Sequence, residues 1–211
     1  MAELRSLVVV LGDQLDCNAS AFDGFDAGID AVWMAEVADE STHVQSGKPR
    51  TALFLAAMRH FAQALQAAGR PLHYVRLDSP DNCGGLAGQL QADIARLRPS
   101  RLVMTQPGDW RVLQAMLAVA RGCSLPLDIR EDRHFYCSVG NFAAHAQGRK
   151  SLRMEYFYRE QRKHHRVLMD GDGPVGGKWN FDADNREAFG PAGPGDVPAR
   201  SCFAPDAITH R

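Results

Sequence analysis

Short runs of apolar residues alternate with amphipathic stretches through the first 130 residues of the chain. The first run, Leu7-Val8-Val9-Val10-Leu11, contains no polar residue and ends at Gly12. A continuous apolar run of this length predicts a strand that is buried on both faces, as the strands of a parallel sheet are. Apolar runs predict four further strands, over residues 31–37, 72–77, 101–105 and 125–130.

The segments between the later strands have the periodicity of amphipathic helices. Phe54, Met58, Phe61 and Leu65 recur at the spacing of one helix face, and the turn at 69–71 ends the pattern. Similar stripes of Leu, Ile, Val and Met predict helices over residues 86–97 and 112–120. Such stripes usually form core, so none of them is assigned to a binding site.

Strands and helices that alternate in this order predict an α/β fold. We expect a Rossmann-like open five-stranded parallel sheet with helices on both faces, followed by an extended linker. The domain core is expected to occupy residues 1–135.

The pattern changes beyond residue 135. Helices are predicted over 139–147 and 151–169, and we expect residues 136–169 to pack on or beside the core. The second helix carries a basic face, which we interpret as solvated rather than as a nucleic-acid contact. Glycine and proline interrupt residues 170–211, which predicts a linker. Trp179 and Phe181 lie in this linker and are expected to dock on the α/β body.

Composition narrows the class of protein. The 211 residues are 45% hydrophobic and 23% charged, with a formal net charge of −1, so no global basic field favours nucleic acid or anionic lipid. The absence of a membrane-length apolar run and of a signal peptide predicts a cytoplasmic protein. The five cysteines are scattered and form no Cys-x-x-Cys pair, which predicts free thiols and no metal site.

Polar residues follow the first two strands at the edge of the sheet where ligands bind in open α/β folds. Gly12, Asp13 and Gln14 come directly after the first strand. Glu36 and Glu40 lie at the end of the second strand and beyond it. The sequence therefore predicts a binding site at this edge, and it predicts no catalytic residue.

Each of these acidic residues also has a purely structural interpretation. Asp13 could cap the turn that follows it, and Glu40 could begin a helix. Glu36 could pair with Arg59 or with Arg111. The sequence pattern by itself leaves these alternatives open.

A series of short segments resembles the photolyase-related proteins of bacteria, the branch of iron–sulfur bacterial cryptochromes and prokaryotic (6-4) photolyases. The segments occur in family order and span nearly the whole chain. They are Leu11-Gly12-Asp13-Gln14-Leu15, Glu36-Val37-x-x-Glu40, and residues 57–62, 74–78, 107–111, 129–132, 154–159 and 176–182.

The resemblance implies a domain that houses a light-harvesting antenna chromophore, 6,7-dimethyl-8-ribityllumazine. In the family a connector leads from this domain to a helical domain that holds FAD and a 4Fe-4S cluster. This chain ends about where the family enters that domain, so we expect both cofactors only in a missing C-terminal domain, and no catalysis by this chain. Expected partners are the small-molecule chromophore and the flavin domain. Only a full-length parent protein, which would perform light-driven DNA repair or blue-light sensing, is expected to bind DNA. No membrane partner is expected.

The resemblance also extends the candidate site. The residues that match the antenna neighbourhood are Gly12, Asp13, Gln14, Met34, Glu36 and Glu40. His43 is a departure, because relatives can carry an aromatic residue there, and it is included as a possible wall of the pocket. The alternative hypothesis is a stand-alone Rossmann-like module that binds a small molecule or another protein.

Overall fold

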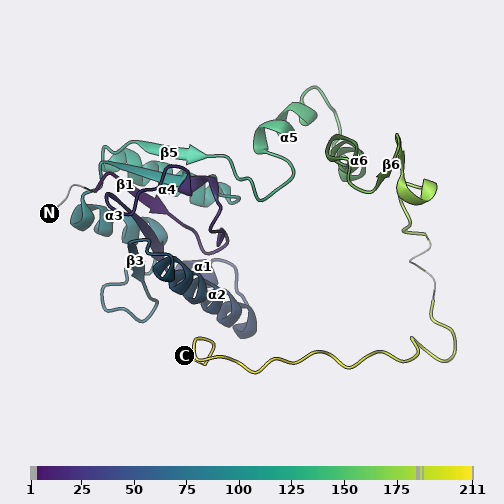
Figure 1. The fold of residues 1–211 in the computed structure, drawn as a ribbon, viewed down its shortest axis with the longest axis horizontal. Coiled ribbons are helices and arrows are strands. Elements are labelled where there is room, and N and C mark those ends of the chain that lie inside the picture. Colours follow the sequence, from purple (N-terminus) through teal and green to yellow (C-terminus); the bar gives the residue numbers. More distant parts are fainter. Residues whose placement is uncertain (1–3, 184–185, 187, 211) are drawn as a thin grey trace. The chain divides into compact units, whose positions relative to one another are not determined.

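The structure is a computed structural model that describes residues 4–183, 186 and 188–210. The chain forms two compact units, Met1–His134 with Pro205–Arg211, and Phe135–Ala204. The first, which we call the α/β unit, contains the sheet (Figure 1).

Five parallel strands form the sheet of the α/β unit, in the order β3-β2-β1-β4-β5. The strands are β1 (Ser6–Val9), β2 (Asp30–Ala35), β3 (Leu72–Val75), β4 (Arg101–Thr105) and β5 (Leu127–Arg130). The predicted α/β fold with an open parallel sheet is thus confirmed. The chain runs outward from β1 to β3 and then returns to place β4 beside β1. This reversal makes the boundary between β1 and β4 the topological switch point.

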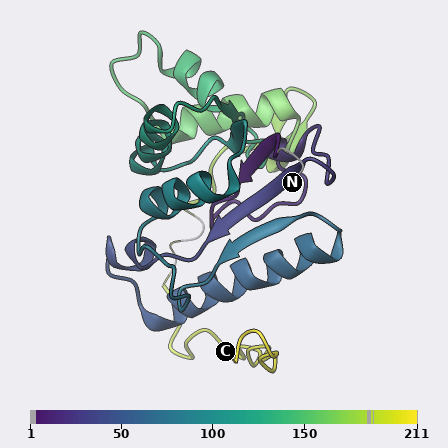
Figure 2. The same ribbon diagram turned by 90° about the vertical axis from the view of Figure 1, so that its left-hand side faces the viewer.

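Helices cover both faces of this sheet. They are α2 (Lys48–Ala67), α3 (Leu86–Leu97) and α4 (Trp110–Gly122), with the short 3-10 helix η1 (Ser20–Phe22). The five-residue helix α1 (Ala38–Thr42) follows β2 and contributes no buried residue to either face. Helix α2 and η1 pack on one face, and α3 and α4 pack on the other (Figure 2).

Residues of β1 and its extension alternate between these two faces. Leu7, Val9 and Leu11 belong to the core under α3 and α4, whereas Val8 and Val10 belong to the core under α2. All five are at most 5% exposed. Burial on both faces explains why the run contains no polar residue.

Four of the five strands are shorter than predicted. Strand β1 ends at Val9 rather than at Leu11, and β3 ends at Val75 rather than at Leu77. We expected the second strand to reach Val37, but it ends at Ala35, because Val37 is already the N-cap of α1. The fifth strand begins at Leu127 rather than at Leu125. Pro126 has no N–H to donate, so it contributes only its carbonyl, to the Leu102 amide at 2.9 Å.

The second unit consists of α5 (Val139–Ala146), α6 (Met154–His165), the two-stranded hairpin of β6 (Met169–Asp170) and β7 (Gly173–Pro174), and the 3-10 turn η2 (Val175–Gly177). Helices α5 and α6 meet through Phe142 and Phe157, whose rings lie edge to face 5.2 Å apart. We expected a helix up to residue 169. It ends at His165 because Arg166 adopts a left-handed conformation with a φ of 57°.

The docking of Trp179 and Phe181 on the α/β body stays a prediction. Within the second unit, Trp179 packs on α6. Its ring lies beside three cations of α6, with Arg159, Arg162 and Lys163 at 5.5, 5.3 and 5.4 Å from the ring centroid. The predicted linker 170–211 contains β7 and η2, and its residues 184, 185, 187 and 211 lie outside the described part.

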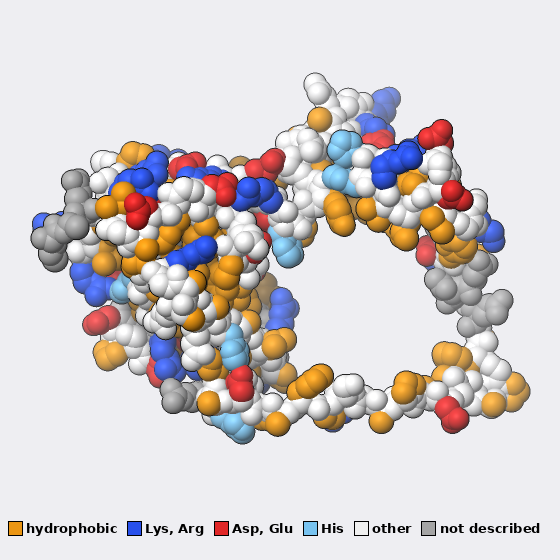
Figure 3. Space-filling model, in the orientation of Figure 1, with side chains coloured by type: hydrophobic (Ala, Val, Ile, Leu, Met, Phe, Trp, Pro, Cys, Tyr) orange, Lys and Arg blue, Asp and Glu red, His pale blue; other side chains and the backbone are white. Residues whose placement is uncertain are grey.

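All five cysteines are free thiols. No helix in the described part of the chain is both long and apolar enough to cross a membrane. Among the same residues, no three His, Cys, Asp or Glu side chains form a group that could hold a metal ion. Acidic and basic side chains intermingle on the visible face of the α/β unit (Figure 3), in keeping with the small net charge.

Candidate functional site

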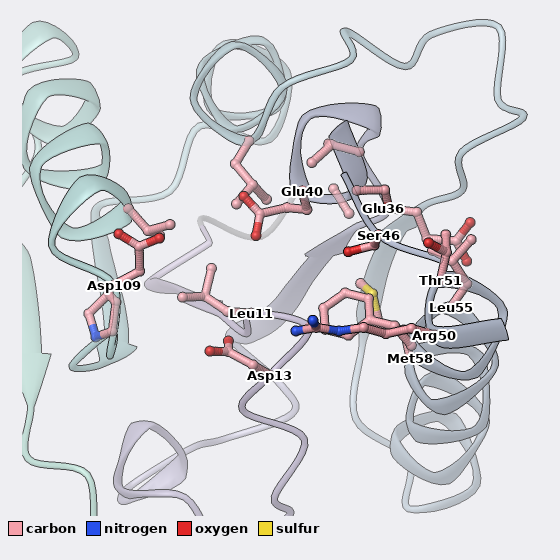
Figure 4. Close-up of a pocket in the computed structure, with 18 residues that line it drawn as sticks. Leu11, Asp13, Glu36, Glu40, Ser46, Arg50, Thr51, Leu55, Met58 and Asp109 are labelled. Atoms are coloured by element: carbon pink, nitrogen blue, oxygen red, sulfur yellow. The ribbon is translucent and has the colours of Figure 1, made fainter. Parts of the chain in front are cut away.

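A pocket opens at the carboxyl edge of the sheet, beside the switch point. It encloses about 220 Å³ and is lined by the segments that follow β1, β2 and β4, together with the first turns of α2 (Figure 4). This volume lies below the roughly 300–1,000 Å³ of pockets that enclose whole drug-sized ligands. The lining residues are Leu11, Gly12, Asp13, Ala35, Glu36, Val37, Glu40, Ser41, Ser46, Arg50, Thr51, Phe54, Leu55, Met58, Leu86, Pro107, Asp109 and Val112.

Gly12 allows the Phe54 ring to approach the end of β1. A Cβ atom at position 12 would lie 2.5 Å from Cζ of Phe54 and 2.9 Å from Sδ of Met58, both below any real contact distance. The backbone of Gly12 is not in the left-handed region, so close packing rather than turn geometry requires glycine here. Phe54 and Met58 form the apolar wall of the pocket on the α2 side.

Three carboxylates and one guanidinium give the pocket its charge. Asp13 follows β1, Glu40 lies in α1, and Asp109 is the N-cap of α4, where it accepts a hydrogen bond from the Arg111 amide at 2.7 Å. This backbone hydrogen bond lowers the pKa of Asp109, so its carboxylate stays ionised near neutral pH. The Arg50 side chain extends from α2 into the pocket, and it forms no ion pair with any residue of the described chain (Figure 4).

Glu36 lines the pocket, but protein groups already satisfy its carboxylate. Arg59 donates two hydrogen bonds, 2.7 and 2.9 Å long, to the two oxygens. The Tyr74 hydroxyl donates to one of them, and the Leu77 amide donates to the other at 2.9 Å. The side chain of Glu36 is 0% exposed. Of the two partners that the sequence left open for Glu36, the structure selects Arg59.

Burial and hydrogen bonding act on this network in opposite directions. Burial raises the pKa of Glu36, but the hydrogen bonds from Arg59, Tyr74 and the Leu77 amide outweigh it, and the pKa is lowered overall. Burial raises the pKa of Tyr74, and its hydrogen bond to Glu36 raises it further. At neutral pH the network therefore holds an anionic Glu36 and a neutral Tyr74.

Gln14 supports the edge of the sheet rather than lining the pocket. Its side-chain amide donates to the carbonyl oxygen of Gln106 at 2.9 Å, which ties the segment after β1 to the segment after β4 across the switch point. The other amide atom, Oε1, is buried and has no hydrogen-bond partner within the described residues. Gln14 thus helps to position the loop that carries Asp109.

The structure brings together four of the seven residues proposed from the sequence. Gly12, Asp13, Glu36 and Glu40 line the pocket. Met34 is fully buried in the core beneath α2, and His43 is exposed at the end of α1. Together with Gln14, these two residues are absent from the pocket lining.

Four of the 18 lining residues were proposed from the sequence, and among the others three matter most for the chemistry of the pocket: Phe54, Asp109 and Arg50. Phe54 was assigned to the helix core, because the periodicity that places it on the inner face of α2 cannot distinguish core from pocket wall. Two signals could have identified Asp109. It lies in a segment that resembles the family, and an Asp just before an amphipathic helix is a typical helix N-cap, which here places a carboxylate after the end of a strand. Arg50 gave no signal, because nothing local distinguishes it from a solvated cation.

This arrangement is suited to bind an uncharged heteroaromatic ligand. Carboxylates accept hydrogen bonds from ring N–H and hydroxyl groups, and a guanidinium donates to carbonyl oxygens. The apolar wall formed by Phe54, Met58 and Leu11 excludes water from the ring faces.

Comparison with known proteins identifies the family of the chain. The profile of the family described as "Deoxyribodipyrimidine photo-lyase-related protein" matches residues 8–211. The chain is also 45% identical, over 207 residues, to a protein of Agrobacterium fabrum strain C58 named "(6-4) photolyase". That alignment covers 98% of this chain and 40% of the relative, so the chain spans about two fifths of the relative's length. The chain therefore belongs to the family of deoxyribodipyrimidine photolyase-related proteins.

Proposed function

We propose that this chain is an antenna domain, and that its pocket binds 6,7-dimethyl-8-ribityllumazine. The observation that carries the proposal is the convergence of Asp13, Glu40, Asp109 and Arg50, from four separate elements, on one cavity with an apolar wall. The resemblance of its segments to the photolyase-related proteins suggested the class of ligand.

The residues present fit the lumazine ring. Its pyrimidinedione edge has one N–H donor and two carbonyl acceptors, which match a carboxylate such as Glu40 and the guanidinium of Arg50. Phe54 and Met58 would pack on the ring faces. When bound, the chromophore would absorb light and transfer the excitation energy. The residues of the chain hold it, orient it and exclude water.

The wider setting is part of the same proposal. A full-length parent would carry FAD and a 4Fe-4S cluster in the portion that the 40% coverage of the relative leaves out, and it would repair DNA or sense blue light. DNA would then be a partner of the parent. Five free cysteines suit the reducing cytoplasm, where we place the protein.

A fluorescence titration with ribityllumazine tests the proposal. Glu40→Ala should weaken binding about ten- to a hundredfold, because a lost hydrogen bond of this kind costs roughly 1–3 kcal/mol. Glu155→Ala is the matched control, since Glu155 lies in the second unit and pairs with Arg159. The proposal fails if the unsubstituted chain shows no saturable binding, or if the two substitutions weaken binding equally.

A further inference from the structure

The segment 205–210 lies against the exposed surface of α2. It belongs to the α/β unit, whereas the residues that precede it, Phe135–Ala204, form the second unit. The contact joins His60 and Asp206, with Nε2 of the histidine 2.8 Å from a carboxylate oxygen. His60 lies on the exposed side of α2, and both side chains are about half exposed. The contact is therefore a surface pair between residues that lie far apart in the chain.

Asp206 uses its two carboxylate oxygens for different partners. Its Oδ1 accepts hydrogen bonds from the backbone amides of Ile208 and Thr209, at 3.1 and 2.9 Å, and from the Thr209 hydroxyl at 2.9 Å. Its Oδ2 is left for His60. Ile208 is partly buried, whereas all the other residues from 188 to 210 are exposed. The segment is thus a folded turn with one charged contact and one apolar side chain partly withdrawn from water.

We propose that the segment 205–210 is a strap that anchors the tail of the chain on the exposed surface of α2, and that protonation of His60 strengthens this anchor. A histidine ordinarily gains its charge between about pH 8 and about pH 5. Asp206 is already ionised there, because the hydrogen bonds from the Thr209 amide and hydroxyl lower the pKa of its carboxyl, as does the charge of His60. A neutral His60 offers a hydrogen bond, and a protonated one adds charge attraction.

No other charge competes for either member of this pair. Among the described residues, neither His60 nor Asp206 takes part in a second ion pair. The neighbouring cation of α2, Arg59, is held by Glu36. The strap has one other titratable side chain, His210, which forms no ion pair within the same part of the chain. The charge state of His60 therefore sets the strength of the anchor above the lowered pKa of Asp206.

A weak anchor is sufficient here, because the strap is tethered to the surface on which it docks. An exposed ion pair changes such an equilibrium about two- to fivefold. Tethering makes docking an intramolecular step, which needs no high affinity. With the strap docked, the second unit is attached to the α/β unit at both of its ends, by the chain at residue 135 and by the anchor at Asp206. With the strap released, only the first attachment remains.

Amide NMR relaxation of the full chain tests the strap, because it distinguishes a segment that tumbles with the α/β unit from a free tail. We expect the amides of Ile208 and Thr209 to relax like those of α2 at about pH 6, and the ratio of docked to free strap to fall about two- to fivefold by about pH 8.5. His60→Gln should give the lower ratio at both pH values. His60→Lys carries a permanent charge and should keep the higher ratio at both. His210→Gln is the control within the strap and should behave like the parent chain.

Three results would overturn the proposal. The first is a strap that is free at both pH values, and the second is a strap whose docking in the parent chain does not change with pH. The third is a pH response that survives His60→Gln or that His210→Gln removes equally well. A pH-independent, docked strap in His60→Lys, together with a pH response that only His60→Gln removes, would establish the anchor.

Discussion

At the scale of single residues, Gly12 and Glu36 are explained by packing and pairing within the protein. Gly12 is required by the Phe54 ring, and Glu36 by Arg59 and Tyr74. Asp13, Glu40 and Arg50 differ, because their charged groups line the pocket without comparably short partners. We therefore propose a ligand-binding role for these three residues.

Substitution of Gly12 by alanine should destabilise the chain. The new Cβ would force Phe54 to move, and overpacking of this kind costs about 1–3 kcal/mol. Urea unfolding of both proteins measures the difference. Gly108→Ala is the control, because a Cβ there meets nothing within 4 Å, and its effect should stay within about 0.5 kcal/mol. Equal stability of the two variants would contradict the packing argument.

Glu36→Gln should cost roughly 3–5 kcal/mol at pH 7, because it leaves the Arg59 guanidinium without its buried counter-ion. The pKa of Glu36 is lowered in the folded state, so its stabilisation is present above the unfolded pKa of about 4.3 and is lost as the pH falls through the folded value. Unfolding free energies of parent and variant should therefore converge below that pH. A difference that stays constant down to pH 3 would contradict the sign of this shift.

At the scale of elements, apolar periodicity predicted all five strands and the helices that cover the sheet, because strands buried on both faces have few alternatives. It did not predict where strands begin and end. Strand β2 stops before Val37 because Val37 is the N-cap of α1, and β5 begins after Pro126 because proline has no N–H to donate. The pocket was predictable only where polar residues follow a strand directly. Arg50 was not, because it reaches the site through tertiary packing of α2. The basic face of α6 was interpreted as solvated, whereas the structure places Trp179 beside it.

Asp93 fastens α3 to the sheet and offers a test at this scale. It accepts hydrogen bonds from the Trp33 indole N–H at 2.8 Å and from the side-chain amide of Gln89 at 3.0 Å, and it contacts the His73 ring at 3.0 Å. Asp93→Ala should cost at least 1–3 kcal/mol for the unpaired indole alone, on the order expected of a buried donor. It should also shift the fluorescence of Trp33. Arg96→Ala removes only an exposed partner of Asp93, so urea unfolding should show a loss of about 0–1 kcal/mol. Equal losses of unfolding free energy in the two variants would contradict the role of Asp93 in holding α3 against the sheet.

At the scale of the whole molecule, the two units differ in how much of each is buried. The α/β unit holds both core clusters, whereas residues 188–204 are exposed and form no helix or strand. The pocket at the switch point belongs to the α/β unit, whereas the family match over residues 8–211 includes both units. Antenna binding should therefore be a property of that unit, independent of the segment 188–204.

Limited proteolysis with chymotrypsin tests this division. Phe189 and Phe203 are 75% and 90% exposed, whereas Phe61 in α2 is 8% exposed. Early cuts should fall after Phe189 and Phe203 and leave α2 intact, because cleavage requires locally open backbone. Mass spectrometry of the first fragments identifies the sites. Early cuts within α2 would contradict the division.

The central claim is that the pocket beside the switch point holds the lumazine. An amide NMR titration of the parent chain with 6,7-dimethyl-8-ribityllumazine tests it most directly. We expect saturable changes in chemical shift, all fitting one dissociation constant, for the backbone amides of Gly12, Asp13, Val37 and Arg50. The chemical shifts of the amides of α5 should not change. Shifts confined to the second unit, or no saturable shift at these four amides, would contradict it.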